Sequence, residues 1–143
     1  MKTLKLFAVL LMTTSLSFAQ DTDTESKKVT IEITIDNLRN EKGQVVLALH
    51  TKDTFMKGKG IANVLATVEG NVAKGIFDDV APGSYAILAL HDENSNGRMD
   101  FDSSGMPLED FGSSNNVMVM GPPTYEDAEF TVNDKNLNLN IRF

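Results

Sequence analysis

Two stretches near the ends of the chain alternate strictly between apolar and polar residues, and this pattern limits the possible folds more than any other feature. In residues 29–35 every second residue is Val or Ile, and in residues 137–143 every second residue is Leu, Ile or Phe. Successive side chains of a β-strand point to opposite faces, so each stretch predicts a strand with one buried face. Apolar stripes at helical spacing extend over no more than two turns. We therefore expect an all-β fold.

Six further apolar stretches, separated by turn residues, predict additional strands: 44–51, 63–69, 72–77, 85–90, 117–120 and 128–133. The turn residues at 40–43 predict a hairpin between the first two strands. Pro82-Gly83 fits the central pair of a type II turn, and the strand after it is apolar on both faces, which predicts a central position. Seven or eight short strands of this kind predict a single antiparallel β-sandwich over residues 29–143, with a long loop between two of its strands.

The first residues predict a targeting signal. Two lysines, an unbroken apolar run over residues 6–12 and small residues before a cleavage after Ala19 predict a signal peptide over residues 1–19. The polar stretch 20–28 predicts a disordered leader. The run over 6–12 is too short for a membrane anchor, and because no other stretch approaches that length, we expect no membrane span in the mature chain. The signal predicts an exported protein that is periplasmic or secreted.

The net charge and the lack of cysteine exclude several classes of function. The chain has 13 Lys and Arg against 20 Asp and Glu, a net charge of −7, which becomes −9 when residues 1–19 with their two lysines are removed. A nucleic-acid partner is not expected, because phosphate binding needs clustered Lys and Arg. The chain has no cysteine, which excludes disulfides, thiol nucleophiles and Cys-ligated metals.

The stretch 92–100 carries the most specific chemistry. It reads D-E-N-S-N-G-R-M-D and matches the first nine positions of an EF-hand-type calcium loop, with Gly97 at the position of the sharp turn. The pattern predicts oxygen ligands at alternate positions: Asp92, Asn94, Asn96, the backbone carbonyl of Arg98, and Asp100. Calcium prefers six to eight hard oxygen ligands, and a tight turn directs several alternate residues toward one centre. We therefore predict a calcium loop placed between strands.

The predicted loop departs from an EF-hand at its end. The position that normally supplies a bidentate glutamate is Ser103 here, and either Asp102 or Glu109 could close the ligand sphere. With so few carboxylates, we expect a dissociation constant on the order of 0.1–1 mM, as in extracellular calcium modules. A turn that binds nothing and a site for another hard cation are the alternatives.

The sequence also allows hypotheses of enzymatic activity. A serine of the pair 113–114 with His91 and an aspartate could form a hydrolase triad, although the chain has no G-x-S-x-G motif. A carboxylate pair in the acidic loop could serve glycoside hydrolysis. His50, His91 and Asp92 could form a zinc site if both histidines lay at one edge of the sandwich.

Three motifs resemble a known family. They are H-D-E-N-x-N-G-x-x-D at 91–100, G-x-P-x-E-x-F-G-x-S-N-N at 105–116 and G-P-P-x-Y-E-D-A-x-F at 121–130. In this order they resemble the small exported bacterial proteins catalogued as domain of unknown function 2141. The resemblance implies that Glu109 belongs to the same constellation as the 92–100 loop, and it carries no established activity.

A fourth motif resembles a different group of proteins. The segment F-x-x-V-x-P-G-x-Y at 77–85 resembles a turn and strand of transthyretin-like and carboxypeptidase-regulatory-like domains. This resemblance implies a transthyretin-like or immunoglobulin-like sandwich in which Phe77 and Tyr85 pack into one core.

These observations predict an exported, non-catalytic β-sandwich that acts as a binding or structural module of the cell envelope. Calcium would order residues 92–116 and present Phe101, Met106, Phe111 and the polar run 113–116 to an envelope protein, a peptide or a glycan. The alternative is an extracytoplasmic hydrolase or metal-dependent enzyme that uses the acidic loop and His91.

Overall fold

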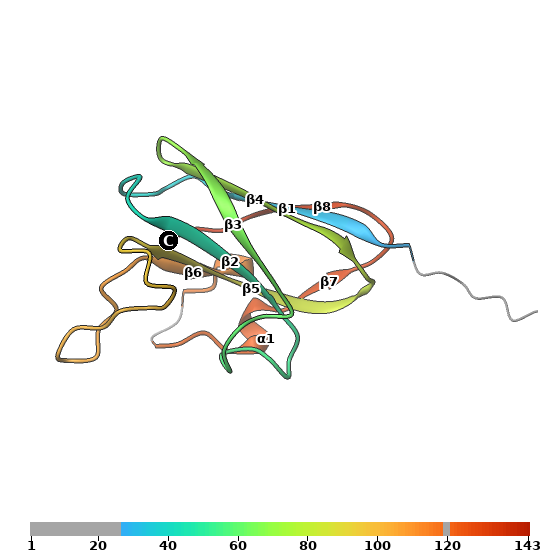
Figure 1. Cartoon of the computed structure of the whole chain (residues 1–143). Coiled ribbons are helices and arrows are strands. Elements are labelled where there is room, and N and C mark those ends of the chain that lie inside the picture. The colour runs from blue at the N-terminus through green and yellow to red at the C-terminus, as the bar shows by residue number, and fades with distance from the viewer. Residues whose placement is uncertain (1–26, 119–120) are drawn as a thin grey trace, which may run out of the picture.

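Eight strands form one continuous sheet that curls on itself (Figure 1). The computed structural model describes residues 27–118 and 121–143, so the predicted signal peptide and most of the predicted leader lie outside the described residues. The strands are β1 (Val29–Ile35), β2 (Gln44–His50), β3 (Ala62–Glu69), β4 (Val72–Val80), β5 (Gly83–Asp92), β6 (Phe111–Ser113), β7 (Phe130–Val132) and β8 (Leu137–Asn140). Among the described residues, the helical elements are the 3-10 turn η1 (Ser114–Asn116) and the one-turn helix α1 (Tyr125–Ala128), so the fold is nearly all-β.

The sheet curls because β3 is shared between its two halves. The strand order is β6-β5-β2-β3-β4-β1-β8, and β7 pairs with the start of β5. Residues 62–66 of β3 pair with β2, and residues 67–69 pair with β4. The two halves approach closely at Gly75, where an added Cβ would lie 2.3 Å from the Leu47 side chain. The outcome is a half-barrel with its apolar side chains inside.

The expectation of a wholly antiparallel sandwich is not met. Strand β8 runs parallel to β1, with Ile31 opposite Leu137 and Ile33 opposite Leu139, so the sheet is mixed. One hydrogen-bonded path connects all the strands, and a sandwich of two separate sheets is therefore not confirmed. Alternation predicts a buried face equally well for either strand direction, so it could not reveal the parallel pair.

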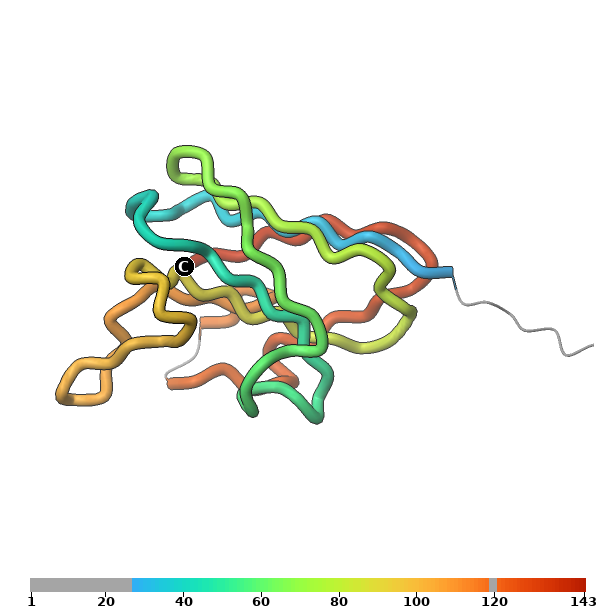
Figure 2. The backbone as a smooth tube through the Cα atoms, in the orientation of Figure 1, coloured from blue at the N-terminus to red at the C-terminus, as the bar shows by residue number. Residues whose placement is uncertain are grey.

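The predicted hairpin between the first two strands is wrong. Strand β1 pairs with β4 and β8, whereas β2 pairs with β3 and β5. The connection over residues 36–43 is longer than a hairpin turn and crosses from one half of the sheet to the other (Figure 2). Leu38 is buried on the way, and its N–H donates to the Asn71 carbonyl at 3.1 Å.

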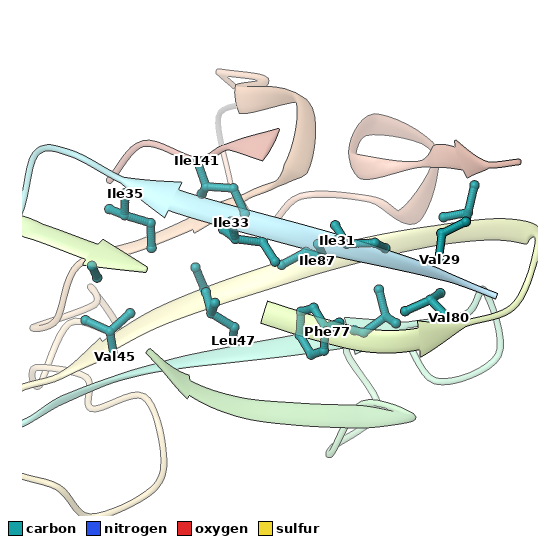
Figure 3. Packing of buried hydrophobic residues seen from close by; sticks show 14 of the residues in the cluster. Val29, Ile31, Ile33, Ile35, Val45, Leu47, Phe77, Val80, Ile87 and Ile141 are labelled. Atoms are coloured by element: carbon teal, nitrogen blue, oxygen red, sulfur yellow. The ribbon is translucent and has the colours of Figure 1, made fainter. Parts of the chain in front are cut away.

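Apolar residues from both halves of the sheet meet in one core. The four inward residues of β1, predicted from alternation, are 0–3% exposed. Figure 3 shows them facing residues of β2, β4 and β5, which include Leu47, Phe77 and Ile87. Tyr85 packs partly buried against the same cluster, as the resemblance at 77–85 implied. Strand β5 pairs with β2, β6 and β7, and this confirms its predicted central position.

The Pro82-Gly83 turn differs from the prediction. Gly83 does not have the positive φ that a type II turn requires at that position. Instead the Tyr85 ring folds back over it, so that an added Cβ would lie 3.3 Å from the ring. The Tyr85 hydroxyl donates to the Ala81 carbonyl at 3.1 Å, which holds this corner.

The segment after residue 116 also departs from expectation. Val117 and Met118 belong to no strand, and the rest of the strand predicted at 117–120 lies outside the described residues. Helix α1 was not predicted, although its capping box was visible in the sequence: the Thr124 hydroxyl accepts from the Asp127 N–H, and Asp127 accepts from the Thr124 N–H. Within residues 27–118 and 121–143, no helix is long and apolar enough to cross a membrane.

Candidate functional site

The predicted calcium loop lies where β5 ends. Asp92 is the last residue of β5 and Phe111 is the first of β6, so residues 93–110 form one long excursion from the sheet. In Figure 2 this segment, gold to orange, projects beyond the ends of the strands. It has two parts: the tight turn 92–100, which contains the predicted ligands other than Glu109, and an arm over 100–108.

Asp92 anchors the turn from inside the fold. Its side chain is fully buried. Oδ1 accepts the N–H of Asn96 at 3.0 Å, and Oδ2 accepts the N–H of Gly97 at 2.8 Å and the side-chain amide of Gln44 at 2.8 Å. Burial by itself raises the pKa of Asp92, but the hydrogen bonds from Gln44, Gly97 and Asn96 outweigh it, and the pKa is lowered. The turn is therefore wound around a buried carboxylate that stays charged.

The polar side chains of Asn94, Asn96 and Asp100 converge on one point. Asp100 Oδ2 accepts hydrogen bonds from the amide nitrogens of both asparagines, at 2.8 Å in the case of Asn96. Asn94 Oδ1 accepts the Asn96 N–H at 3.0 Å, and Asn96 Oδ1 accepts the Arg98 N–H at 3.0 Å. The alternate positions of the motif thus face one another across the turn.

Glu109 clamps the two ends of the turn. It is 7% exposed, and its Oε1 accepts the N–H of Glu93 at 3.0 Å while its Oε2 accepts the N–H of Asp100 at 3.1 Å. The resemblance placed Glu109 in this constellation, and the structure brings it to both ends of the turn. Each of its oxygens is already engaged with the backbone, so in this arrangement Glu109 positions the turn.

The arm over 100–108 is an ordered hairpin. The Leu108 N–H donates to the Asp100 carbonyl at 2.9 Å and the Asp102 N–H donates to the Met106 carbonyl at 2.9 Å, on either side of an isolated bridge between Phe101 and Pro107. Asp102 Oδ1 accepts from the N–H groups of residues 104 and 106 and so closes the tip. Asp102 therefore shapes the arm. Phe101, Met106 and Leu108 are 58–63% exposed on it.

Most of the predicted ligands lie together, but their carboxylates alone are not arranged to hold a metal ion. Asp92, Asn94, Asn96, Asp100 and Glu109 are joined by the hydrogen bonds above, and Arg98 joins them through its backbone N–H. In the part of the chain that the structure describes, no group of three or more His, Asp or Glu side chains is arranged to hold a metal ion. A cation here would depend on amide and backbone oxygens as well as carboxylates.

In the polar run 113–116, the side chains of Ser114, Asn115 and Asn116 all bond backbone groups. The buried Ser114 hydroxyl accepts the Ile87 N–H at 3.0 Å and donates to the Ala128 carbonyl. Asn115 donates to two backbone carbonyls near α1, and Asn116 bonds the backbone of residues 140 and 142. At Gly112 an added Cβ would lie 2.4 Å from the Arg142 carbonyl oxygen. The motif G-x-S-N-N therefore joins the β6 side of the curled sheet to the end of the β8 segment, which accounts for its side chains structurally.

The histidines lie far apart. His50 is opposite Ala86 in the β2–β5 ladder and His91 is opposite Val45, so five residues of strand, about 16 Å, separate them. The proposed zinc site is therefore wrong in its geometry. His91 Nε2 bonds the Lys42 carbonyl at 2.8 Å and its ring stacks on Phe143, so the structure does not pair it with the engaged Ser114 hydroxyl.

Sequence reasoning missed three residues that support the loop. Gln44, the first residue of β2, reaches Asp92 from the neighbouring strand. Arg39 forms an ion pair with Asp110 at 2.6 Å, beside the clamp residue Glu109. Gly43 also lies against the backbone at Asp92 and Glu93, where an added Cβ would lie 2.0 Å from the Asp92 carbonyl oxygen. The Gln44 and Gly43 contacts depend on the β2–β5 pairing, and the Arg39 contact joins residues far apart in sequence, so no local pattern could have identified them.

The comparison with known families supports the predicted resemblance. A family model described as an uncharacterized protein conserved in bacteria (DUF2141) matches residues 33–140, which include the loop and every strand from β2 to β8. No match was found among curated proteins or among solved structures, so the transthyretin-like and immunoglobulin-like resemblance is not confirmed. Because the match covers most of its length, the chain belongs to this family of uncharacterised bacterial proteins.

Proposed function

We propose that residues 92–100 bind calcium and that the protein is an exported, non-catalytic module of the cell envelope. The proposed ligands are the side chains of Asp92, Asn94, Asn96 and Asp100 and the backbone carbonyl of Arg98. Glu109 holds the ends of the turn in register.

The convergence of both asparagine amides on Asp100 Oδ2 carries this proposal. A half-turn of an amide about its last side-chain bond exchanges its nitrogen for its oxygen. That rotation would replace the two amide nitrogens beside Asp100 by two oxygens, and it would give up the bonds that these oxygens now accept from the N–H groups of Asn96 and Arg98. Asp92, with its lowered pKa, contributes a buried negative charge beside them. Hard oxygens gathered around one point are the environment that calcium prefers.

The arm gives the module a surface for a partner. Three large apolar side chains, Phe101, Met106 and Leu108, are exposed on a short hairpin whose base is the turn clamped by Glu109. Binding residues commonly lie on loops that a rigid scaffold positions. An ordered arm loses less conformational entropy on binding than a free loop does. We propose that the arm contacts an envelope protein or peptide.

Calorimetric titration with calcium tests the site. The chain without its predicted signal peptide, residues 20–143, contains every residue that the structure describes. We expect saturable binding with a dissociation constant on the order of 0.1–1 mM. Asp100→Asn removes one proposed ligand charge without touching the buried bonds of Asp92 and should weaken binding at least tenfold, in the range of about 1.4 kcal/mol.

Asp53→Asn is the matched control. It removes the same charge from an exposed side chain in the connection between β2 and β3, at the opposite end of β2 from the loop. It should bind calcium as the unmodified chain does. Equal weakening by both substitutions would show a general effect of net charge, and no heat at several millimolar calcium would refute the site.

A further inference from the structure

Asn96 and Gly97 form a chemically reactive pair at the centre of the turn. Asn96 is the asparagine of this chain that is followed by glycine. A backbone nitrogen can attack the side-chain carbonyl carbon of the preceding asparagine. Glycine favours this attack because it has no Cβ to obstruct the approach. Both residues are exposed, and the place where a Cβ of Gly97 would lie is open, with no atom within 4 Å.

The attacking nitrogen and the side-chain oxygen of the attacked carbonyl each have a hydrogen-bond partner in the turn. The nucleophile, Gly97 N, donates its hydrogen to Asp92 Oδ2 at 2.8 Å, and this bond fixes the position of the nitrogen next to the Asn96 side chain. The electrophile's oxygen, Asn96 Oδ1, accepts the Arg98 N–H at 3.0 Å, and this contact stabilises negative charge that develops there. The same turn therefore holds a positioned nucleophile and an oxyanion donor.

We propose that Asn96 is a site of spontaneous deamidation in the folded protein. Gly97 N forms a bond to Asn96 Cγ as its proton passes to solvent hydroxide. The Cγ–Nδ2 bond then breaks, and Nδ2 takes up a proton and leaves as ammonia, so that a succinimide remains. Water opens the ring at either carbonyl and yields aspartate or isoaspartate at position 96. Solvent water is the co-reactant.

The two products have different consequences for the turn. Aspartate keeps an oxygen for the Arg98 N–H and adds one negative charge at the fifth position of the loop. Isoaspartate adds a methylene to the backbone between Asp92 and Asp100, so the hydrogen bonds that close the turn cannot all re-form. The reaction thus changes the same turn that we propose to bind calcium, but it needs no metal and does not depend on that proposal.

Peptide mapping by mass spectrometry tests the inference. The chain 20–143 is incubated at neutral pH with EDTA, natively folded and unfolded in urea. We expect aspartate and isoaspartate to accumulate at Asn96 in the folded chain while Asn94, followed by serine in the same turn, stays intact. An Asn96 that stays intact in the folded chain while the unfolded chain converts would overturn the proposal, as would equal conversion at Asn94.

Two variants test the chemistry. Gly97→Ala places a methyl group beside the nucleophile and should slow conversion in both the folded and the unfolded chain. Asp92→Asn keeps the shape of the side chain but removes its charge and weakens the bond that positions Gly97 N, so conversion should slow in the folded chain and stay unchanged in urea. A folded Asp92→Asn chain that converts as fast as the unmodified chain would refute the assigned role of Asp92.

Discussion

Glu109 offers the sharpest test of how the loop is held. Its two carboxylate oxygens each accept one backbone N–H, from Glu93 and Asp100, and the side chain is 7% exposed. Glu109→Gln keeps the volume and one acceptor oxygen but turns an amide NH2 group toward the other N–H. A hydrogen bond to a charged group contributes about 1.5–3 kcal/mol, and an unpaired buried donor costs about 1–3 kcal/mol. We expect the free energy of unfolding to fall by about 2–3 kcal/mol.

Urea denaturation followed by circular dichroism, with EDTA present, measures this loss. For a domain of this size it corresponds to a midpoint temperature lowered by roughly 8–12 °C. Glu69→Gln is the control, because Glu69 is an exposed carboxylate at the end of β3, and we expect it to change the free energy by less than about 0.5 kcal/mol.

The absence of metal in this assay separates two roles of Glu109. A residue that acted only as a ligand would stabilise the protein only when calcium binds, since a ligand stabilises the state to which it binds. A clamp stabilises the metal-free chain as well. If Glu109→Gln unfolds at the same urea concentration as the unmodified chain in EDTA, Glu109 does not hold the turn and the reasoning is wrong.

Three further predictions concern other parts of the chain. Gly112→Ala places a Cβ 2.4 Å from the Arg142 carbonyl oxygen, so we expect a loss of about 1–3 kcal/mol in chemical denaturation, and an unchanged midpoint would contradict the close approach. Burial lowers the pKa of His50 despite its backbone hydrogen bond to Thr54, so the unfolded state binds the proton more readily. Stability should therefore rise with pH between the lowered pKa and the ordinary histidine value, and His50→Gln should remove that rise from the pH profile. Calcium should slow the deamidation of Asn96, because a coordinated side chain is turned away from the Arg98 N–H and is fixed against the rotation that the attack requires. An unchanged rate at saturating calcium would remove Asn96 from the ligand set.

The strands were predictable because their signal is local. The four inward residues of β1 and the boundaries of β2 follow from alternation and turn residues, and both agree with the structure to within a residue. The pairing of strands was not predictable in the same way. The turn residues at 40–43 suggested a hairpin between β1 and β2. Instead β1 pairs with β4, and the connection to β2 crosses between the halves of the sheet with Leu38 buried along it. Whether a chain reverses or crosses depends on contacts between residues far apart in sequence.

In the candidate site too, local spacing was predictable and contacts between distant segments were not. The spacing of Asp92, Asn94, Asn96 and Asp100 placed them in one turn, and the structure joins them there. The polar run 113–116 had the composition of a binding loop, yet its side chains bond the backbone of distant segments. Composition could not separate these two cases, because an amide that caps a strand and an amide that binds a ligand have the same chemistry.

The hydrogen bonds of the loop meet an electrostatic requirement of the calcium site that we propose. Carboxylates gathered without a cation repel one another and destabilise the metal-free fold. Here the charges of Asp92 and Glu109 are directed at backbone N–H groups, two on each side chain, and Asp100 faces two amides. Each negative charge therefore has partners before a cation binds, and the turn keeps its shape. A cation would need to rotate two amides and compete for oxygens that are already hydrogen-bonded, and this accounts for the modest affinity that we expect.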